Sequence, residues 1–496
     1  MRFGVRQLFL TAIGIAALAA AISPVTDPDF FWHMRVGQHI LETATIPTRD
    51  LFTYTVSSHR FVAHEWLSEV IMSSLSRGLG LWAVVLFFGL LTWAGFLVLL
   101  ATPRDVSFVV RGLALALGIA AGNAIWGPRT QMITFAFVVF LLYLLRRWRA
   151  DLDRRWLYPI PPLFILWVNL HAGFTIGLIF LVVYAVGEAI TRAAARQPVG
   201  PALRPLLLTT AGAVVLAAVN PNGPLIYPYA VATQFSPAQQ RLIVEWFSPD
   251  FHQYTQVGAY EVMLLLVPVL LALGGRRPRF TDLLLLLAGM TLSLQSVRHI
   301  ALFVAVATPV VAEIAEGIVE RARTAGLRLR EPRTTPVTAA INVVVAVLVV
   351  LVLLVVKVPD LRQTTTTQAV RSQFPVAALD ALGTDLPPGN VFNAYGWGGY
   401  FVYRLYPSRR VYIYGDAAVM GDPFLTEYES VENLHSDYLQ VLDRRGVTWV
   451  LDRSDAPLVS VLRNSTDWAT VYRDNLATVL VRRTGATRTY LARHPG

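Results

Sequence analysis

Long apolar runs alternate with short polar connections along the first 356 residues of the chain. A helix needs about 20 residues to cross a bilayer upright, and several runs are shorter, so their boundaries and their number, about eleven, are approximate. The pattern predicts a multi-span α-helical membrane domain over residues 1–357. The runs lie near 5–24, 79–101, 107–126, 131–145, 157–170, 173–190, 205–219, 257–273, 280–296, 300–317 and 337–356.

The polar connections between these runs differ in charge, and every second one is rich in arginine. Arginine in short loops stays on the cytoplasmic side of a membrane. The alternation therefore predicts a multi-pass protein of the plasma (inner) membrane with a cytoplasmic N-terminus. The basic set comprises Arg2 and Arg6; Arg104; Arg146, Arg147, Arg149, Arg154 and Arg155; Arg192, Arg196 and Arg204; Arg276, Arg277 and Arg279; Arg321, Arg323, Arg328, Arg330 and Arg333.

The largest connection on the opposite, extracytoplasmic side covers residues 25–78 and begins with an acidic motif, Asp27-Pro28-Asp29. The following residues, 30–42, mix apolar and polar side chains at helical spacing. They predict an interfacial helix whose aromatic side chains face lipid. His64-Glu65-Trp66 heads a second apolar-periodic run in the same loop. Acidic and imidazole groups beside a bilayer are unfavourable unless they have a partner or a task.

Asp27 also has a purely structural interpretation. An aspartate followed by proline is a good helix start, with Asp27 as the N-cap and Pro28 at the first helical position. Asp29 would then only complement the helix dipole. Capping does not explain why so many other ionisable groups fall on the same predicted side.

Other polar motifs lie in the remaining connections of that side. Taken singly, each has an ordinary explanation: Asn169 and His171 could cap helix ends, and Arg129 and Arg298 could reach lipid headgroups. All nine histidines of the chain are predicted to lie on this side, however, so together these motifs predict one extracytoplasmic polar cavity. Its candidate residues are Asp27, Asp29, His33, His64, Glu65, Arg129, Asn169, His171, Glu245, Arg298 and His299.

The composition becomes more polar after Val356, and residues 358–496 are predicted to form a soluble extracytoplasmic α/β domain. Two glycine-containing motifs, Gly396-Trp397-Gly398-Gly399-Tyr400 and Tyr414-Gly415-Asp416, are expected at strand ends, as functional loops or as tight turns with core aromatics. The expected strands are Val391–Asn393, Val411–Tyr414, Val447–Leu451 and Thr478–Val481, and the expected helices are Phe374–Leu382 and Tyr438–Arg444.

The overall composition agrees with an integral membrane protein, because 55% of the residues are hydrophobic and only 15% are charged. The net charge of +10 is explained by the arginine-rich loops, so no nucleic-acid partner is expected. The chain has no cysteine, which excludes disulfides, thiolate metal sites and cysteine nucleophiles.

An acidic motif after the first span, many further spans and a C-terminal extracytoplasmic domain resemble the GT-C superfamily of membrane glycosyltransferases. The similarity is greatest to bacterial members of uncertain substrate that combine such a loop with His-Glu-Trp and a Gly-Trp-Gly-Gly-Tyr tail domain. The resemblance implies transfer of a sugar, a hexose or a pentose, from a polyprenyl-phosphate-linked donor to an acceptor outside the cytoplasm, with inversion at the anomeric carbon. The implied partners are the lipid-linked donor, membrane lipid and an unidentified acceptor.

The candidate residues suit that chemistry. The acceptor hydroxyl needs a general base, for which Asp27 and Asp29 are equivalent candidates. The leaving lipid phosphate needs cations, for which Arg129, Arg298 and His299 are candidates. The substrate-positioning candidates are His33, His64, Glu65, Asn169, His171 and Glu245.

A divalent metal is a further possibility in this loop, since some GT-C enzymes use one and others do not. Asp29 and His33 are spaced i, i+4 and share a helix face, and His64 and Glu65 could complete the site.

Two other classes compete with a glycosyltransferase. A transporter or a lipid or polysaccharide flippase also needs polar groups, but near the membrane midplane and commonly with internal repeats; here the groups gather at one face and no repeat is evident. A membrane-anchored scaffold would not need so many spans.

Overall fold

The computed structural model describes residues 3–274, 276–326, 334–361 and 363–494. The chain forms two compact units, and neither is continuous in sequence. Unit 1 comprises residues 1–23, 84–224 and 244–362, and unit 2 comprises residues 24–83, 225–243 and 363–496. The first large loop therefore groups with the C-terminal segment, whereas the linear boundary between residues 357 and 358 stays a prediction.

Unit 1 is helical, and each of the eleven apolar runs forms a helix in the structure. Among the residues that the structure describes, six helices are long and apolar enough to cross a membrane, namely α4, α6, α8, α12, the segment containing α14, and α15. The multi-span α-helical class is thus confirmed, while the number of spans stays a prediction. The helices are α1 (Val5–Ala21), α4 (Leu81–Ala101, its first three residues counted with unit 2), α5 (Phe108–Ala121), α6 (Gln131–Asp151), α7 (Ile160–Leu170), α8 (Phe174–Ala194), α9 (Gly200–Leu216), α12 (Tyr254–Leu273), α13 (Phe280–Gln295), α14 (Ile300–Thr324) and α15 (Pro336–Leu361).

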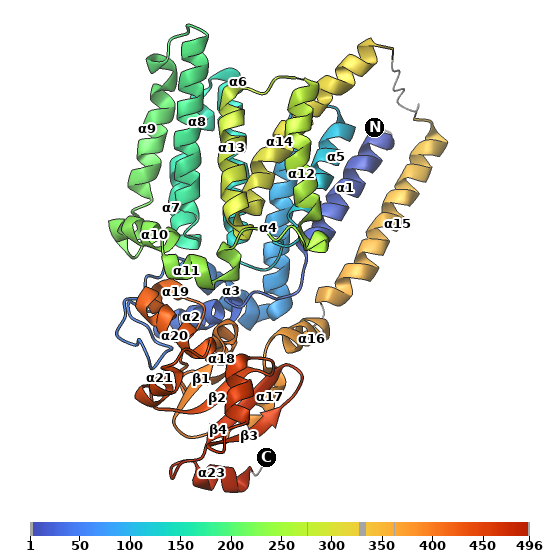
Figure 1. Cartoon of the computed structure of the whole chain (residues 1–496). Helices are drawn as coiled ribbons and strands as arrows, with labels where there is room; N and C mark the ends of the chain where they lie inside the picture. Colours follow the sequence, from blue (N-terminus) through green and yellow to red (C-terminus); the bar gives the residue numbers. More distant parts are fainter. Residues whose placement is uncertain (1–2, 275, 327–333, 362, 495–496) are drawn as a thin grey trace. The chain divides into compact units, whose positions relative to one another are not determined.

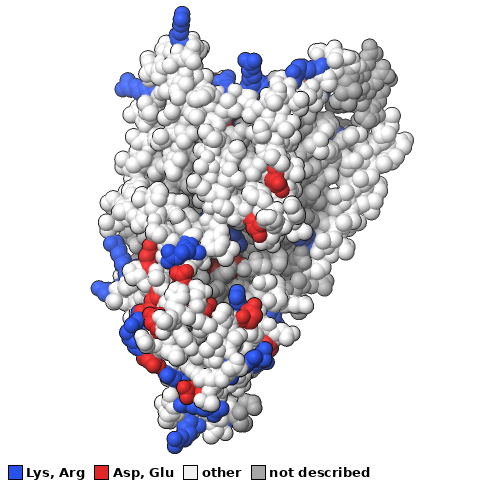
Figure 2. Space-filling view, in the orientation of Figure 1, with Lys and Arg blue, Asp and Glu red and all other residues white. Residues whose placement is uncertain are grey.

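The helices of unit 1 run alternately up and down (Figure 1). The connection from α8 to α9 and the end of α14 lie at one end of the unit, and the connections from α7 to α8 and from α13 to α14 lie at the other. Figure 2 shows Lys and Arg side chains along the first of these ends, with a mostly uncharged surface over the helices below it. This separation is the one that the loop charges predict.

Burial varies strongly among the candidate spans. In the segment that contains α14, 78% of the most apolar 18-residue stretch is buried. In α15 only 6% of the corresponding stretch is buried. The helices α5, α12 and α13 pack around α14, whereas α15 packs on α1. Since α15 is almost wholly apolar and exposed, it suits contact with lipid.

Unit 2 combines helices of the first loop with a small sheet of the C-terminal segment. Strands β1 and β2 are parallel, the other neighbours are antiparallel, and the strand order is β1-β2-β4-β3. The predicted α/β layer is confirmed. The strands are β1 (Asn390–Asn393), β2 (Val447–Arg453), β3 (Trp468–Arg473) and β4 (Ala477–Arg482); the helices are α2 (Phe30–Thr43), α3 (Trp66–Leu79), α10 (Ile226–Gln234), α11 (Pro237–Leu242), α16 (Gln363–Gln373), α17 (Val376–Leu382), α18 (Gly398–Leu405), α19 (Ala417–Met420), α20 (Asp422–Glu432), α21 (Tyr438–Arg444), α22 (Pro457–Arg463) and α23 (Arg488–Arg493).

One expected strand, Val411–Tyr414, is wrong. Its backbone groups find partners outside the sheet: the N–H of Tyr412 donates to the Asn393 side chain at 2.9 Å, and Val411 exchanges backbone hydrogen bonds with the loop at residues 52–54. The chain there makes one isolated bridge at Val411 and then bends at Tyr412, so it is not a sheet strand. The edge strand that the sequence did not reveal is β3.

The helices α2 and α3 form as predicted and cross closely. A side chain at Gly37 on α2 would place its Cβ 1.9 Å from the backbone oxygen of Glu69 on α3, so only glycine fits. The expectation that the aromatic side chains of α2 face lipid is wrong. Phe31 is 1% exposed because Phe374 and Tyr400, which lie far along the chain, cover it with ring contacts of 5.0 and 4.9 Å.

Candidate functional site

The acidic motif forms the turn that leads into α2. The helix begins at Phe30 and its N-cap residue is Asp29, so the interpretation of Asp27 as the N-cap is wrong. Oδ1 of Asp27 accepts the backbone N–H of Asp29 at 2.9 Å, and Oδ1 of Asp29 accepts the indole N–H of Trp32 at 3.0 Å. Asp27 is 8% exposed, and Asp29 is half-buried. Both carboxylates are thus held in defined positions within unit 2.

The two glycine motifs of the C-terminal segment lie directly against this turn. A Cβ at Gly415 would lie 1.6 Å from Oδ1 of Asp29, and a Cβ at Gly399 would lie 2.8 Å from the backbone oxygen of Pro28. Within the C-terminal segment, a Cβ at Gly398 would lie 2.0 Å from the Ile413 oxygen. Gly398 and Gly399 therefore permit backbone approaches that no other residue allows, and a side chain at Gly415 would displace the Asp29 carboxylate. These contacts explain the glycines better than a tight turn does.

Next to the acidic turn, carboxylates and imidazoles form an alternating chain. Nδ1 of His33 lies 3.0 Å from Oε1 of Glu69, and Nε2 of His33 lies 3.4 Å from Oε2 of Glu65. The other oxygen of Glu65 lies 3.3 Å from Nε2 of His64, whose Nδ1 is 3.1 Å from the Tyr229 hydroxyl on α10. The ring centroids of His33 and Trp32 lie 3.7 Å apart. Because the Trp32 indole donates to Asp29, this ring contact connects the chain of carboxylates and imidazoles to Asp29.

The two imidazoles carry a positive charge at neutral pH. Burial alone would lower the pKa of His33, but Glu65 and Glu69 raise that pKa to about 9. Burial acts in the same way on His64, where Glu65 and Asp416 raise the pKa to about 9. The two imidazolium ions thus partly neutralise the carboxylates around them.

The sequence prediction missed two acidic members of this region, Glu69 and Asp416. Both are buried, and burial raises the pKa of each carboxyl group above its usual value. Oδ1 of Asp416 accepts the N–H of Val419 at the start of α19. Glu69 is four residues after Glu65 and so shares its helix face, a spacing visible in the sequence; Asp416 was noted only as part of a motif.

The predicted metal ligands do not fit a metal as they are placed. Both ring nitrogens of His33 and one of His64 face the carboxylates of Glu65 and Glu69, so a metal would have to break these ion pairs. Among the residues that the structure describes, no three His, Asp or Glu side chains are arranged to hold a metal ion.

A second polar cluster lies within unit 1, between the start of α6 and the start of α14. Arg129 donates to Oε1 of Glu245 at 2.9 Å, and the side-chain amide of Gln131 donates to Oε2 of the same carboxylate at 3.0 Å. The Arg298 guanidinium lies over the Trp246 ring at 4.7 Å. His299 is 8% exposed, and its Nδ1 has no hydrogen-bond partner among the described residues.

Asn169 and His171 lie elsewhere in unit 1 and hold helices together. The amide of Asn169 donates to the backbone oxygens of Ile165 and Val219, both at 2.8 Å. His171 ends α7, and its Nδ1 contacts the Thr134 hydroxyl at 2.8 Å and the Gly173 N–H at 2.9 Å. These contacts agree with the structural alternative for both residues.

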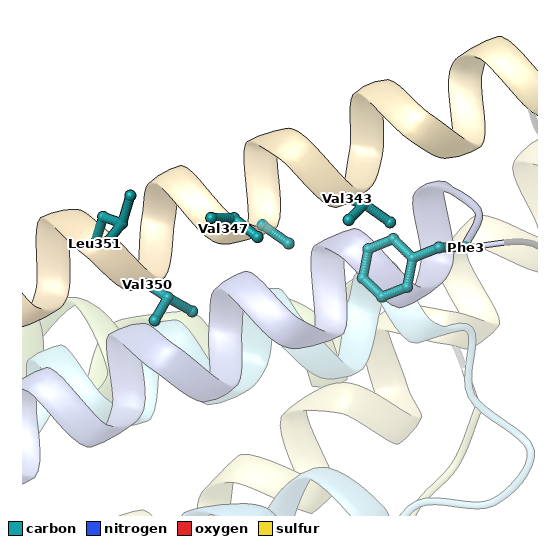
Figure 3. Close-up of a pocket in the computed structure, with 6 residues that line it drawn as sticks. Phe3, Val343, Val347, Val350 and Leu351 are labelled. Carbon is teal, nitrogen blue, oxygen red and sulfur yellow. The ribbon is translucent and has the colours of Figure 1, made fainter.

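Unit 1 also has a groove of about 390 Å³ between the N-terminal segment and α15 (Figure 3). Its walls are entirely apolar, so it offers nothing to hold a sugar, and it contains none of the candidate residues. The lining residues are Phe3, Val343, Ala346, Val347, Val350 and Leu351.

No family model and no curated protein matches the chain. Solved structures do. The oligosaccharyltransferase AglB from Archaeoglobus fulgidus, in complex with an inhibitory peptide and a dolichol-phosphate, matches 90% of this chain and 69% of its own, with a TM-score of 0.55 and 13% identity. Its apo form matches 96% of this chain and 74% of its own, with a TM-score of 0.51.

These matches show that the chain shares the fold of this membrane oligosaccharyltransferase, as the resemblance in the sequence predicts. A weaker match is ArnT from Cupriavidus metallidurans bound to undecaprenyl phosphate, with a TM-score of 0.46, 15% identity, and coverage of 97% of this chain and 98% of that one. At these identities the likeness concerns the fold.

Proposed function

We propose that this protein is a membrane glycosyltransferase that moves a sugar from a polyprenyl-phosphate-linked donor to an acceptor hydroxyl outside the cytoplasm. The observation that carries the proposal is the GT-C fold shared with AglB, whose structure holds a dolichol-phosphate. The acidic turn and the arginine cluster supply the two kinds of group that the reaction needs. The proposed orientation, from the loop charges, has a cytoplasmic N-terminus and an extracytoplasmic C-terminal domain in the plasma membrane.

Asp29 is the proposed general base. It is the more exposed of the two carboxylates in the turn, while Asp27 is buried and holds the backbone N–H of Asp29. In this mechanism the Asp29 carboxylate takes the proton of the acceptor hydroxyl as the acceptor oxygen attacks the anomeric carbon. Attack from the face opposite the phosphate forms the new C–O bond, breaks the bond to the phosphate and inverts the anomeric configuration.

The negative charge that develops on the leaving lipid phosphate requires fixed positive groups. Arg129 and Arg298 are the proposed groups, and the buried ring of His299 lies beside them at the N-terminus of α14, a 25-residue helix. Exposed N–H groups at a helix N-terminus favour an anion. The support for this role is the concentration of cationic and polar donors at the start of that helix.

The test compares Asp29→Asn with Asp27→Asn in full-length protein reconstituted in lipid nanodiscs. Asn is nearly isosteric with Asp and still accepts hydrogen bonds, so both variants should fold and melt like the wild type. Asp29→Asn should lower the consumption of polyprenyl-phosphate-linked sugar by about 10²-fold or more, the usual scale for a lost general base. Asp27→Asn should have a smaller effect. Full activity in both variants would refute the catalytic assignment.

A further inference from the structure

The resident partner of the proposed phosphate-binding cations is the carboxylate of Glu245. Its two oxygens accept from two different donors, Arg129 at 2.9 Å and Gln131 at 3.0 Å. A phosphate group presents two oxygens to a pair of donors in the same way. Glu245 therefore occupies Arg129, which the proposed function assigns to the lipid phosphate, together with the neighbouring donor Gln131.

Further cationic and polar groups surround this carboxylate. Burial alone would raise the pKa of Glu245, but Arg129 and Arg298 overcome that effect and lower the pKa. Arg298 stacks on Trp246 and donates no hydrogen bond to a carboxylate of the described residues. His299 is nine-tenths buried, and its Nδ1 finds no partner in the described part of the chain. The cluster thus contains polar groups, on Arg298 and His299, that do not bond to the Glu245 carboxylate.

The backbone around Glu245 is held independently of its side chain. The hydroxyl of Ser296 donates to the backbone oxygen of Glu245 at 2.8 Å, and the N–H of Val297 donates to the oxygen of Phe247 at 2.9 Å. Two anchors therefore tie the Glu245 segment to the start of α14. The carboxylate can rotate away from its two donors without releasing the loop.

We propose that Glu245 is a built-in occupant of the donor-phosphate subsite: its carboxylate keeps Arg129 and Gln131 aligned, yields both donors to the arriving phosphate, and takes them back when the lipid phosphate leaves. This inference rests on the proposed function. It makes Glu245 a competitor of the ligand, rather than the direct ligand contact that the sequence suggested. No covalent bond changes; two hydrogen bonds are exchanged between anions.

The experiment measures the binding of undecaprenyl phosphate, without a sugar, to full-length protein in nanodiscs. Glu245→Gln removes the competing charge and places an amide opposite the Gln131 donor, so the lipid phosphate should bind about tenfold tighter. Turnover should fall at the same time, because product release slows. Glu245→Asp keeps the charge but has a shorter reach to the two donors, so its affinity should lie between those of Gln and the wild type.

Two controls isolate the competition. Glu261→Gln removes one negative charge from α12 of the same unit but leaves the Glu245 carboxylate on both of its donors, so it should leave the affinity unchanged. In an Arg129→Ala background, Glu245→Gln should no longer tighten binding, because the donor for which the anions compete is gone. A melting curve for each variant separates binding effects from loss of fold.

The outcomes distinguish this inference from the function on which it rests. Weaker or unchanged binding in a folded Glu245→Gln variant would mean that Glu245 is a structural brace for Arg129, and the inference would be overturned. The proposed function would still hold if Arg129→Ala and Arg298→Ala weakened binding. If neither arginine variant changed binding, the phosphate subsite itself would be refuted, and the inference with it.

Discussion

The carboxylate–imidazole chain of unit 2 and the Glu245 cluster of unit 1 stabilise buried charge in different ways. In unit 2, carboxylates alternate with imidazoles, as in the chain from Glu69 through His33 and Glu65 to His64. In unit 1, one carboxylate, Glu245, faces arginines whose charge does not change at any physiological pH. The first arrangement contains imidazoles that can gain and lose protons, whereas the second relies on arginines of permanent charge.

This difference matches the two halves of a sugar transfer. Accepting the proton of a hydroxyl needs carboxylates held among titratable neighbours, and stabilising a phosphate needs permanent cations. In the proposed mechanism, unit 2 supplies the carboxylate and unit 1 supplies the cations. The comparison can be tested at each cluster separately, because a substitution that disables one cluster should leave the function of the other intact.

The largest effect is expected from Gly415→Ala in unit 2. The new Cβ would lie 1.6 Å from Oδ1 of Asp29, so the carboxylate must move, and a displacement of about 1 Å at a catalytic group lowers turnover by about 10²-fold. The measurement is donor consumption in nanodiscs. Gly396→Ala is the matched control, because a Cβ at Gly396 meets nothing within 4 Å, and it should be silent.

The Gly415→Ala variant should still bind undecaprenyl phosphate, because the proposed binding residues lie in unit 1. Loss of both activity and lipid-phosphate binding would show that the variant has misfolded or that the two tasks are not separable. Normal activity would show that the close approach of Gly415 to Asp29 has no bearing on catalysis.

The sequence predicted features that depend on local contacts and missed features that depend on contacts between distant residues. The helices of unit 1 were predictable because apolar runs of nearly spanning length form helices in lipid. The burial of Phe31 was not, since Phe374 and Tyr400 cover it from more than 300 residues away. The pairing of the Tyr414 hydroxyl with Asp50 at 3.1 Å spans 364 positions, and no periodicity reveals it.

The site shows the same limit. His33, Glu65 and His64 could be proposed because their residue types fell in one predicted loop, and Glu69 was within reach of the i, i+4 spacing from Glu65. The role of Gly415 could not be predicted from the sequence, because it depends on a close approach that only three-dimensional packing creates. Sequence patterns identified chemical groups, and long-range packing determined which groups meet.

A smaller effect is expected from the arginines of unit 1. Replacing Arg129 or Arg298 with Ala should weaken donor use about tenfold, and replacement with Lys should weaken it less, because Lys keeps the charge and loses the planar two-pronged contact. The apparent affinity for the acceptor should change little. Turnover against varied lipid-linked donor measures this. Arginines that only reach lipid headgroups would behave differently, since Lys would then be silent and Ala would mainly lower the melting temperature.

The smallest expected effect separates the clusters by pH. In the folded protein His33 and His64 have a pKa of about 9, above the ordinary value of 6.5. Their ion pairs therefore stabilise the fold fully below about pH 6.5, and this contribution is lost as the pH rises through about 9. The carboxyl pKa values of Glu69 and Asp416 are also raised in the folded protein. They too make stability fall as the pH rises, but this fall occurs at lower pH than that of the histidines.

Melting curves from pH 6 to pH 10 should accordingly show a melting temperature that falls by a few degrees on the alkaline side. His33→Gln should be less stable at pH 6 and show a shallower fall, because one titrating group is gone. Undecaprenyl phosphate binding by unit 1 should stay nearly constant from pH 8 to pH 10, since the phosphate, whose second pKa is about 6, is fully ionised there and arginine does not titrate. A steep loss of lipid-phosphate binding together with a flat melting profile would reverse the comparison and place the pH-sensitive group beside the arginines.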